Sequence, residues 1–183
     1  MQKAFITYYQ ECTITALNIL KNLSLATERK KMEVLLDNRQ NKYKISLKKV
    51  KQKARDILNA LACPDAELSI LIVDDPEIGE LNKKYLDRHG PTNVIAFPMR
   101  TGQFNNIAPQ LLGDVVISIE TAAREGKMVG ISMEERFTQL LVHGILHLLG
   151  YDHEKNKTQA YEMEKKSNEI LKLIKMEDIR WLD

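Results

Sequence analysis

From residue 32 onward, the apolar and polar positions of this chain follow two regular periods. Short apolar runs rich in β-branched residues predict four strands, at residues 33–37, 68–73, 93–97 and 113–119. The run at 68–73 is nearly continuous, which is typical of a strand buried on both faces. Residues 99–112, between the last two strands, contain glycine and asparagine and predict a long loop.

Apolar residues at helical spacing predict helices between these strands. Ser46 is a suitable N-cap for a helix over 47–61, and Asp74 precedes a short helix that extends to Tyr85. Further helices are expected at about 120–128 and 157–175. The last of these has core-spaced apolar residues and a charged outer surface, so we expect it to be a supporting wall: Met163, Ile170 and Ile174.

One further helix is expected to be central in the fold. Ser132 and Glu135 form an S-x-x-E capping box that begins it, and Gly150 is a suitable residue for its end. Few of its residues are polar after Gln139. A buried helix of this kind holds its side chains rigidly, which a binding site requires.

Residues 1–31 lack this regularity. A helix over 13–25 is compatible with the sequence, but no clear cap or partner follows it. We therefore take as a hypothesis that the folded domain spans 32–183. Residues 1–31 would then be an N-terminal extension or an upstream translation artefact.

Composition narrows the class of protein. The chain has 183 residues, 44% hydrophobic and 28% charged, which suits one soluble globular domain. Its two cysteines, Cys12 and Cys63, are far apart and are interpreted as free thiols in a reducing compartment. No run of eighteen apolar residues is present, so we expect no membrane span and a cytoplasmic location.

The net charge of +2 gives no overall polyelectrolyte signal, but one segment is strongly basic. Residues 29–55 contain eleven Lys or Arg side chains against two acidic ones. Five of the eleven are expected on the polar face of the helix at 47–61: Lys48, Lys49, Lys51, Lys53 and Arg55. This face is either a solvated surface or a contact for phosphates, with Lys48, Lys49 and Lys51 as candidates. Tyr43 is the only aromatic residue there, so base stacking on this segment is not expected.

The strongest chemical signal is a cluster of histidines. Three of the four histidines lie within eleven residues, as His143, His147 and His153. The first two are four apart, so their rings project from one face of a helix. A turn at Gly150 can bring the third to the same point. Three imidazoles that converge in this way predict a catalytic type of zinc site, with one ion and a fourth position open for water.

The spacing also fits the H-E-x-x-H-x-x-G-x-x-H pattern of metzincin proteases at every position except one. Gly144 stands where those enzymes carry the glutamate that acts as general base. The ligand set is kept and the base is missing, so peptide hydrolysis by that mechanism is disfavoured.

Four segments in order resemble the YbeY family of bacterial rRNA maturation factors, which are metal-dependent endoribonucleases. They are L-N-K-K-Y at 81–85, P-T-N-V-I-A-F-P at 91–98, L-G-D-V-V-I-S at 112–118, and the histidine motif at 143–153. The resemblance spans about residues 32–176. It implies an α/β (α+β) domain with a small mixed sheet flanked by helices and a central metal-binding helix with a zincin-like ligand arrangement.

The resemblance also implies a function. Zinc would be held by His143, His147 and His153, and the substrate would be single-stranded rRNA at the 3′ end of the small-subunit RNA. Partners would be the small ribosomal subunit and its assembly proteins. Two alternatives stay open: a non-catalytic ribosome assembly factor whose zinc braces the fold, and another zinc hydrolase.

One departure from the family concerns the arginine that usually follows the tyrosine. Leu86 occupies that position, and Arg88 lies two residues further on. We take Arg88 as the candidate catalytic guanidinium, because its planar fork suits phosphoryl groups. Asp152, next to a predicted ligand, either orients a histidine ring or caps the turn after Gly150.

Overall fold

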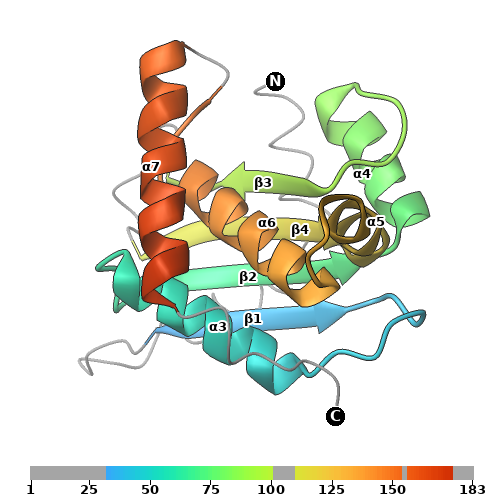
Figure 1. Ribbon diagram of the computed structural model, residues 1–183, viewed down its shortest axis with the longest axis horizontal. Helices are drawn as coiled ribbons and strands as arrows, with labels where there is room; N and C mark the ends of the chain where they lie inside the picture. Colours follow the sequence, from blue (N-terminus) through green and yellow to red (C-terminus); the bar gives the residue numbers. More distant parts are fainter. Residues whose placement is uncertain (1–31, 101–109, 154–155, 175–183) are drawn as a thin grey trace, which may run out of the picture.

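A four-stranded mixed sheet forms the centre of the molecule (Figure 1). The computed structural model describes residues 32–100, 110–153 and 156–174. The strands are β1 (Glu33–Asn38), β2 (Glu67–Val73), β3 (Val94–Pro98) and β4 (Leu111–Ser118), in the spatial order β1-β2-β4-β3. Neighbouring pairs are parallel, except that β3 runs antiparallel to β4.

Five helices are described around this sheet. They are α3 (Leu47–Ala60), α4 (Asp75–Leu86), α5 (Ile119–Val129), α6 (Met133–Leu148) and α7 (Lys157–Leu173). A polar side chain accepts a hydrogen bond from the first turn of every one of them: Ser46, Asp74, Ser118, Ser132 and Asn156. Local sequence therefore determines where each helix begins.

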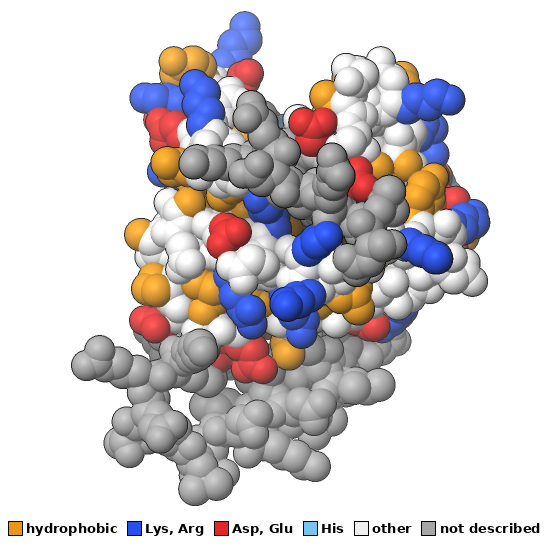
Figure 2. Space-filling view, turned by 60° about the horizontal axis from the view of Figure 1, so that its bottom comes forward, with side chains coloured by type: hydrophobic (Ala, Val, Ile, Leu, Met, Phe, Trp, Pro, Cys, Tyr) orange, Lys and Arg blue, Asp and Glu red, His pale blue; other side chains and the backbone are white. Residues whose placement is uncertain are grey.

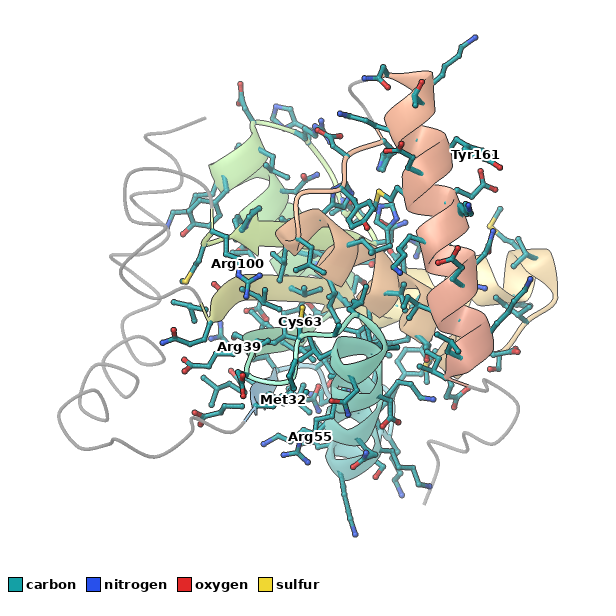
Figure 3. The ribbon with its side chains drawn as sticks, turned by 90° about the vertical axis from the view of Figure 1, so that its left-hand side faces the viewer. Met32, Arg39, Arg55, Cys63, Arg100 and Tyr161 are labelled. Atoms are coloured by element: carbon teal, nitrogen blue, oxygen red, sulfur yellow. The ribbon has the colours of Figure 1, made fainter. Side chains whose placement is uncertain are left out.

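Strand residues alternate between two apolar clusters, one on each side of the sheet. The larger cluster contains Leu68, Ile70 and Ile72 of β2 together with the apolar faces of α3, α6 and α7. The smaller one joins Val73 and Val116 to α4. Figure 3, in which the left side of Figure 1 faces the viewer, shows α7 and α4 on opposite sides of the sheet. α6 packs on β3 and β4 within the larger cluster, so its position relative to the sheet is fixed.

Most predicted elements are confirmed to within a few residues. The sequence predicts the last strand over 113–119, and β4 begins at Leu111 and ends at Ser118. It begins earlier because Leu111 pairs with Glu67 of β2. It ends earlier because the Ser118 hydroxyl accepts a hydrogen bond from the Thr121 backbone and draws Ile119 into α5.

The basic face predicted for α3 needs one correction. Lys53 is buried, and its Nζ donates to the Ile174 carbonyl oxygen, 3.0 Å away, so it is not part of a solvated face. Its ammonium holds the C-terminal end of α7 against α3.

Several predictions concern segments outside the described residues. These are the helix over 13–25, the extension over 1–31, most of the loop over 99–112, and Cys12. Cys63 is a free thiol. No helix among the described residues is long and apolar enough to cross a membrane.

Candidate metal centre

The scaffold of the site is α6, whose first turn is fixed by reciprocal hydrogen bonds. The backbone N–H of Glu135 donates to the Ser132 hydroxyl at 3.0 Å, and the Ser132 N–H donates to the Glu135 carboxylate at 2.9 Å. This is the capping box predicted from the sequence. Two of the four N–H groups that a helix leaves unpaired at this end are thus satisfied.

The other end of α6 is a Schellman motif. The Tyr151 N–H donates to the Leu146 carbonyl oxygen at 3.1 Å, and the Gly150 N–H donates to the His147 carbonyl oxygen at 3.0 Å. Gly150 has φ +92°, a left-handed conformation that costs glycine little. The motif turns the chain back so that His153, in the following loop, reaches the face of α6 that carries the other two histidines.

The three imidazoles lie together. The Nε2 atoms of His143 and His147 are 3.1 Å apart, and the centroid of the His153 ring is 5.1 Å from each of the other two ring centroids. One nitrogen from each ring falls within a group whose members are all within 4.8 Å of one another. His143 and His147 are half-buried and His153 is exposed, so the group opens to solvent on the His153 side.

Burial keeps His143 in the form that binds a metal. Burial, and after it the nearby His147, His153 and Arg136, lowers the pKa of His143 to about 4. Below pH 7 and well into the acidic range, this imidazole is neutral. A neutral ring has a lone pair available for a cation and does not repel it.

The donor set fits a zinc ion. Imidazole nitrogen is a preferred zinc ligand, with bonds of about 2.0–2.1 Å, so two such nitrogens lie about 3.3 Å apart in a tetrahedral site. The 3.1 Å between the two Nε2 atoms is close to this value. Two such bonds span at most about 4.2 Å, so the whole group, within 4.8 Å, needs at most a small inward movement of a ring.

Gly144 does not face the three rings. A Cβ atom placed on it would lie 2.6 Å from Cγ1 of Val115 and 3.2 Å from Cγ2 of Val94, so this side of α6 packs directly on the sheet. The position that carries the general base in metzincin proteases therefore has no room for a side chain. This geometry adds a steric reason to the expectation that the protease mechanism is absent.

The structure shows convergence for the three histidines among the residues predicted for the site. The three histidines converge, whereas Lys48, Lys49 and Lys51 lie on α3, and Arg88 lies exposed in the loop between α4 and β3. Asp152 is half-buried in the turn before His153. The roles of Arg88, Asp152 and the three lysines stay predictions.

Two other basic side chains of the 29–55 segment are paired with carboxylates. Arg39 donates to both Asp37 and Glu77, and Lys42 donates to Glu120. In Figure 2, which brings the lower edge of Figure 1 forward, Lys and Arg side chains gather over the α3 side of the molecule. These ion pairs reduce the positive charge that the described part of the segment presents outside α3.

Sequence reasoning missed a cavity of about 350 Å³ next to His143. Its polar lining comes from the residue just before β3, from α6 and from α7: Asn93, Arg136, Gln139, Ser167 and Asn168. Part of a signal was present, since Arg136 and Gln139 lie seven and four residues before His143, on the same stripe of α6. The contributions of Asn93 and α7 depend on the tertiary fold.

Comparisons with known proteins give a consistent result. Residues 35–175 match a family model described as Endoribonuclease YbeY. A protein of that name from Syntrophotalea carbinolica is 47% identical over 143 residues, 78% of this chain and 95% of the relative. Another, from Syntrophus aciditrophicus, is 40% identical over 150 residues, 81% of this chain and 94% of the relative.

A solved structure supports the fold. The solution structure of TM1509 from Thermotoga maritima aligns with a TM-score of 0.54 and 24% sequence identity, covering 78% of this chain and 88% of that one. At this identity the likeness concerns the fold alone.

Proposed function

Because this chain belongs to the YbeY family of endoribonucleases, we propose that it cleaves single-stranded RNA with a zinc ion held by His143, His147 and His153. The observation that carries the proposal is the convergence of the three imidazoles at the C-terminal end of α6. A bound ion with an open position polarises a phosphoryl oxygen and supplies hydroxide at neutral pH.

The chain's own residues have separate tasks in this proposal. The two half-buried histidines of α6 are held rigidly by the core, and the exposed His153 completes the set from the loop. Arg88 is our candidate for a guanidinium that binds the phosphate and offsets its charge. Asp152 either accepts an N–H from a ligand ring or caps the turn.

The proposed substrate is rRNA, cleaved near the 3′ end of the small-subunit RNA during late maturation and quality control. The proposed partners are the small ribosomal subunit and its assembly proteins, and the proposed location is the cytoplasm. Family membership supports this assignment, and so does the group of lysines on α3. A ribosome assembly factor with a purely structural zinc would share these partners but would not cut RNA.

The decisive experiment compares His147→Ala with the unchanged chain, both purified in the same way and loaded with zinc. We expect the variant to lose bound zinc and to lose cleavage of a single-stranded oligoribonucleotide. The matched control is His89→Ala, which removes an exposed histidine outside the group and should leave the zinc content at one ion per chain.

Two results would contradict the proposal. Equal cleavage by the zinc-free variant would assign the activity to a contaminating nuclease. Zinc binding without any cleavage by the unchanged chain would favour the assembly-factor alternative, and zinc-dependent turnover of casein would favour another hydrolase.

A further inference from the structure

The cavity beside His143 lies between α6, α7 and Asn93, the residue just before β3. Its volume of about 350 Å³ is near the lower end of the range for small-ligand pockets, about 300–1,000 Å³. The cavity is therefore large enough for one compact chemical group of a ligand but too small for a long segment of a polymer. His143 is part of its wall, so a ligand in the cavity is adjacent to the proposed metal centre.

The single cationic side chain among its lining residues is neutralised by a carboxylate. Nε of Arg136 donates to Glu125 at 2.8 Å, and its Nη1 donates to Oε1 of Gln139 at 2.9 Å. Asn93 donates to the same Glu125 carboxylate at 3.0 Å, which fixes the carboxylate from a second side. Arg136 is therefore held in place with its charge paired, and the cavity offers no net attraction to a phosphate.

Uncharged hydrogen-bonding groups remain available in the cavity. The Gln139 side chain accepts from Arg136, and its NH₂ group has no partner among the described residues. The Ser167 hydroxyl and the Asn168 amide, both on α7, also make no side-chain hydrogen bond within the described part of the chain. Leu140 and Leu171 supply apolar wall between these groups.

We propose that this cavity binds one unstacked nucleobase of the RNA substrate, next to the phosphodiester bond that is cut. This inference rests on the proposed function, because it assigns a part of the same substrate. Side-chain amides carry a donor and an acceptor side by side and match the edge of a base, and apolar side chains cover its flat faces. Single-stranded RNA alone presents such an edge free of a pairing partner, so the cavity gives a physical reason for single-strand preference.

Binding is tested on the full metal-free chain by NMR, independently of cleavage. The four ribonucleoside 5′-monophosphates are titrated separately, and ribose 5-phosphate and inorganic phosphate serve as probes without a base. We expect nucleotides to shift the side-chain amide signals of Gln139 and Asn168, and the probes without a base to leave them unchanged. Equal shifts with ribose 5-phosphate, or no shift with any nucleotide at millimolar concentration, would overturn the proposal.

Two variants locate the contact. Asn168→Leu changes an exposed position of α7 and Gln139→Leu a half-buried one of α6, and each should weaken nucleotide binding about tenfold, the effect of losing one hydrogen bond. The matched control is Glu162→Leu, an exposed residue of α7 that does not line the cavity, which should leave binding unchanged. Unchanged binding in both cavity variants would refute the assignment.

Cleavage separates this proposal from the proposed function. A series of oligoribonucleotides is made in which the single abasic position moves stepwise along the strand. The unchanged chain should cut poorly the one substrate whose missing base would occupy the cavity. The rate of cleavage by Asn168→Leu should not depend on where the abasic position lies. If the unchanged chain cuts every abasic substrate equally, the base subsite is wrong while the nuclease stands. If it cuts no RNA but the nucleotide shifts are present, the nuclease is wrong while the base site stands.

Discussion

Gly144 determines which side of α6 can carry the metal centre. It lies between the two helical histidines in sequence but faces Val115 and Val94 of the sheet, at a distance that admits no Cβ atom. The close approach of helix and sheet buries this stretch of α6 and leaves the histidine side open. The glycine that stands in place of the metzincin general base is therefore a packing requirement.

Substituting Gly144 by Ala should destabilise the protein. Alanine favours a helix by about 0.5–1 kcal/mol over glycine, but its Cβ would lie 2.6 Å from Cγ1 of the fully buried Val115. Overpacking of this kind costs about 1–3 kcal/mol, so we expect a net loss of about 1–2 kcal/mol in urea unfolding. Because Val115→Ala removes the clashing methyl groups, the double variant should lose less than the sum of the two single losses. Additive losses would show that the clash is relieved elsewhere.

At the scale of elements, the Schellman motif after α6 determines where His153 lies relative to the two histidines on the helix. It depends on Gly150, which has φ +92° and open space around its missing Cβ. Gly130 ends α5 in a similar conformation, with φ +76° and equally open space, but far from any histidine in sequence. These two glycines form a matched pair for separating backbone strain from metal binding.

We predict that Gly150→Ala and Gly130→Ala destabilise the chain by similar amounts, about 1–2 kcal/mol, because each forces a side chain into the left-handed region. Zinc affinity should fall only in Gly150→Ala, because the turn at residue 150 positions His153. Competition with a zinc chelator measures the zinc affinity, and thermal unfolding of the metal-free variants measures the stability. Equal zinc affinity in the two variants would mean that the loop positions His153 without the turn.

Asp75 joins α4, which packs in the smaller cluster, to α5, which packs in the larger cluster on the other side of the sheet. Its carboxylate, in the first turn of α4, accepts hydrogen bonds from Ser118, Thr121 and Arg124. Burial raises the pKa of Asp75, but these three hydrogen bonds outweigh burial and hold the pKa below its usual value of 3.8. The charged form is thus favoured by folding, and α4 is bound to the start of α5.

Replacing Asp75 by Asn should cost about 1–3 kcal/mol at pH 7. The folded-state pKa lies below the unfolded one, so the contribution of the carboxylate is fully present well above pH 3.8 and is lost as the pH falls through 3.8 and then through the folded pKa. The stability difference between Asp75→Asn and the unchanged chain should therefore shrink below about pH 4. Asp65→Asn, at an exposed position, is the control and should change stability by less than about 0.5 kcal/mol at either pH. A difference that stays constant from pH 7 to pH 3 would contradict the charge-based explanation.

At the scale of the whole molecule, the sequence predicted what depends on local chemistry. The capping residues Ser46, Asp74 and Ser132 set helix starts, and the spacing of the three histidines indicated their convergence. Features made by distant segments were not predictable in this way. Lys53 looked like a surface lysine because its partner, the Ile174 carbonyl, is 121 residues away. The cavity beside His143 needed α7 and β3 to be placed against α6.

The same limit applies to the basic surface, and this gives a last prediction. Lys53 is buried, so the predicted contacts of α3 with RNA phosphates come from Lys48, Lys49 and Lys51. Each phosphate neutralised by a lysine releases counterions, so the affinity for a single strand falls with salt by about 0.7 log units per contact and per tenfold increase in salt.

Changing Lys48, Lys49 and Lys51 together to Ala should weaken RNA binding and make its dependence on salt flatter, by up to about 2 in the log–log slope. The control removes three exposed lysines from other helices, Lys83, Lys127 and Lys165, with the same change in net charge. Fluorescence anisotropy of a labelled oligoribonucleotide at several salt concentrations measures both slopes. If the two triple variants flatten the slope equally, the effect is one of net charge, and α3 is a solvated face. A flatter slope only for the α3 variant would establish that this helix contacts the RNA backbone, on the same side of the sheet as α6.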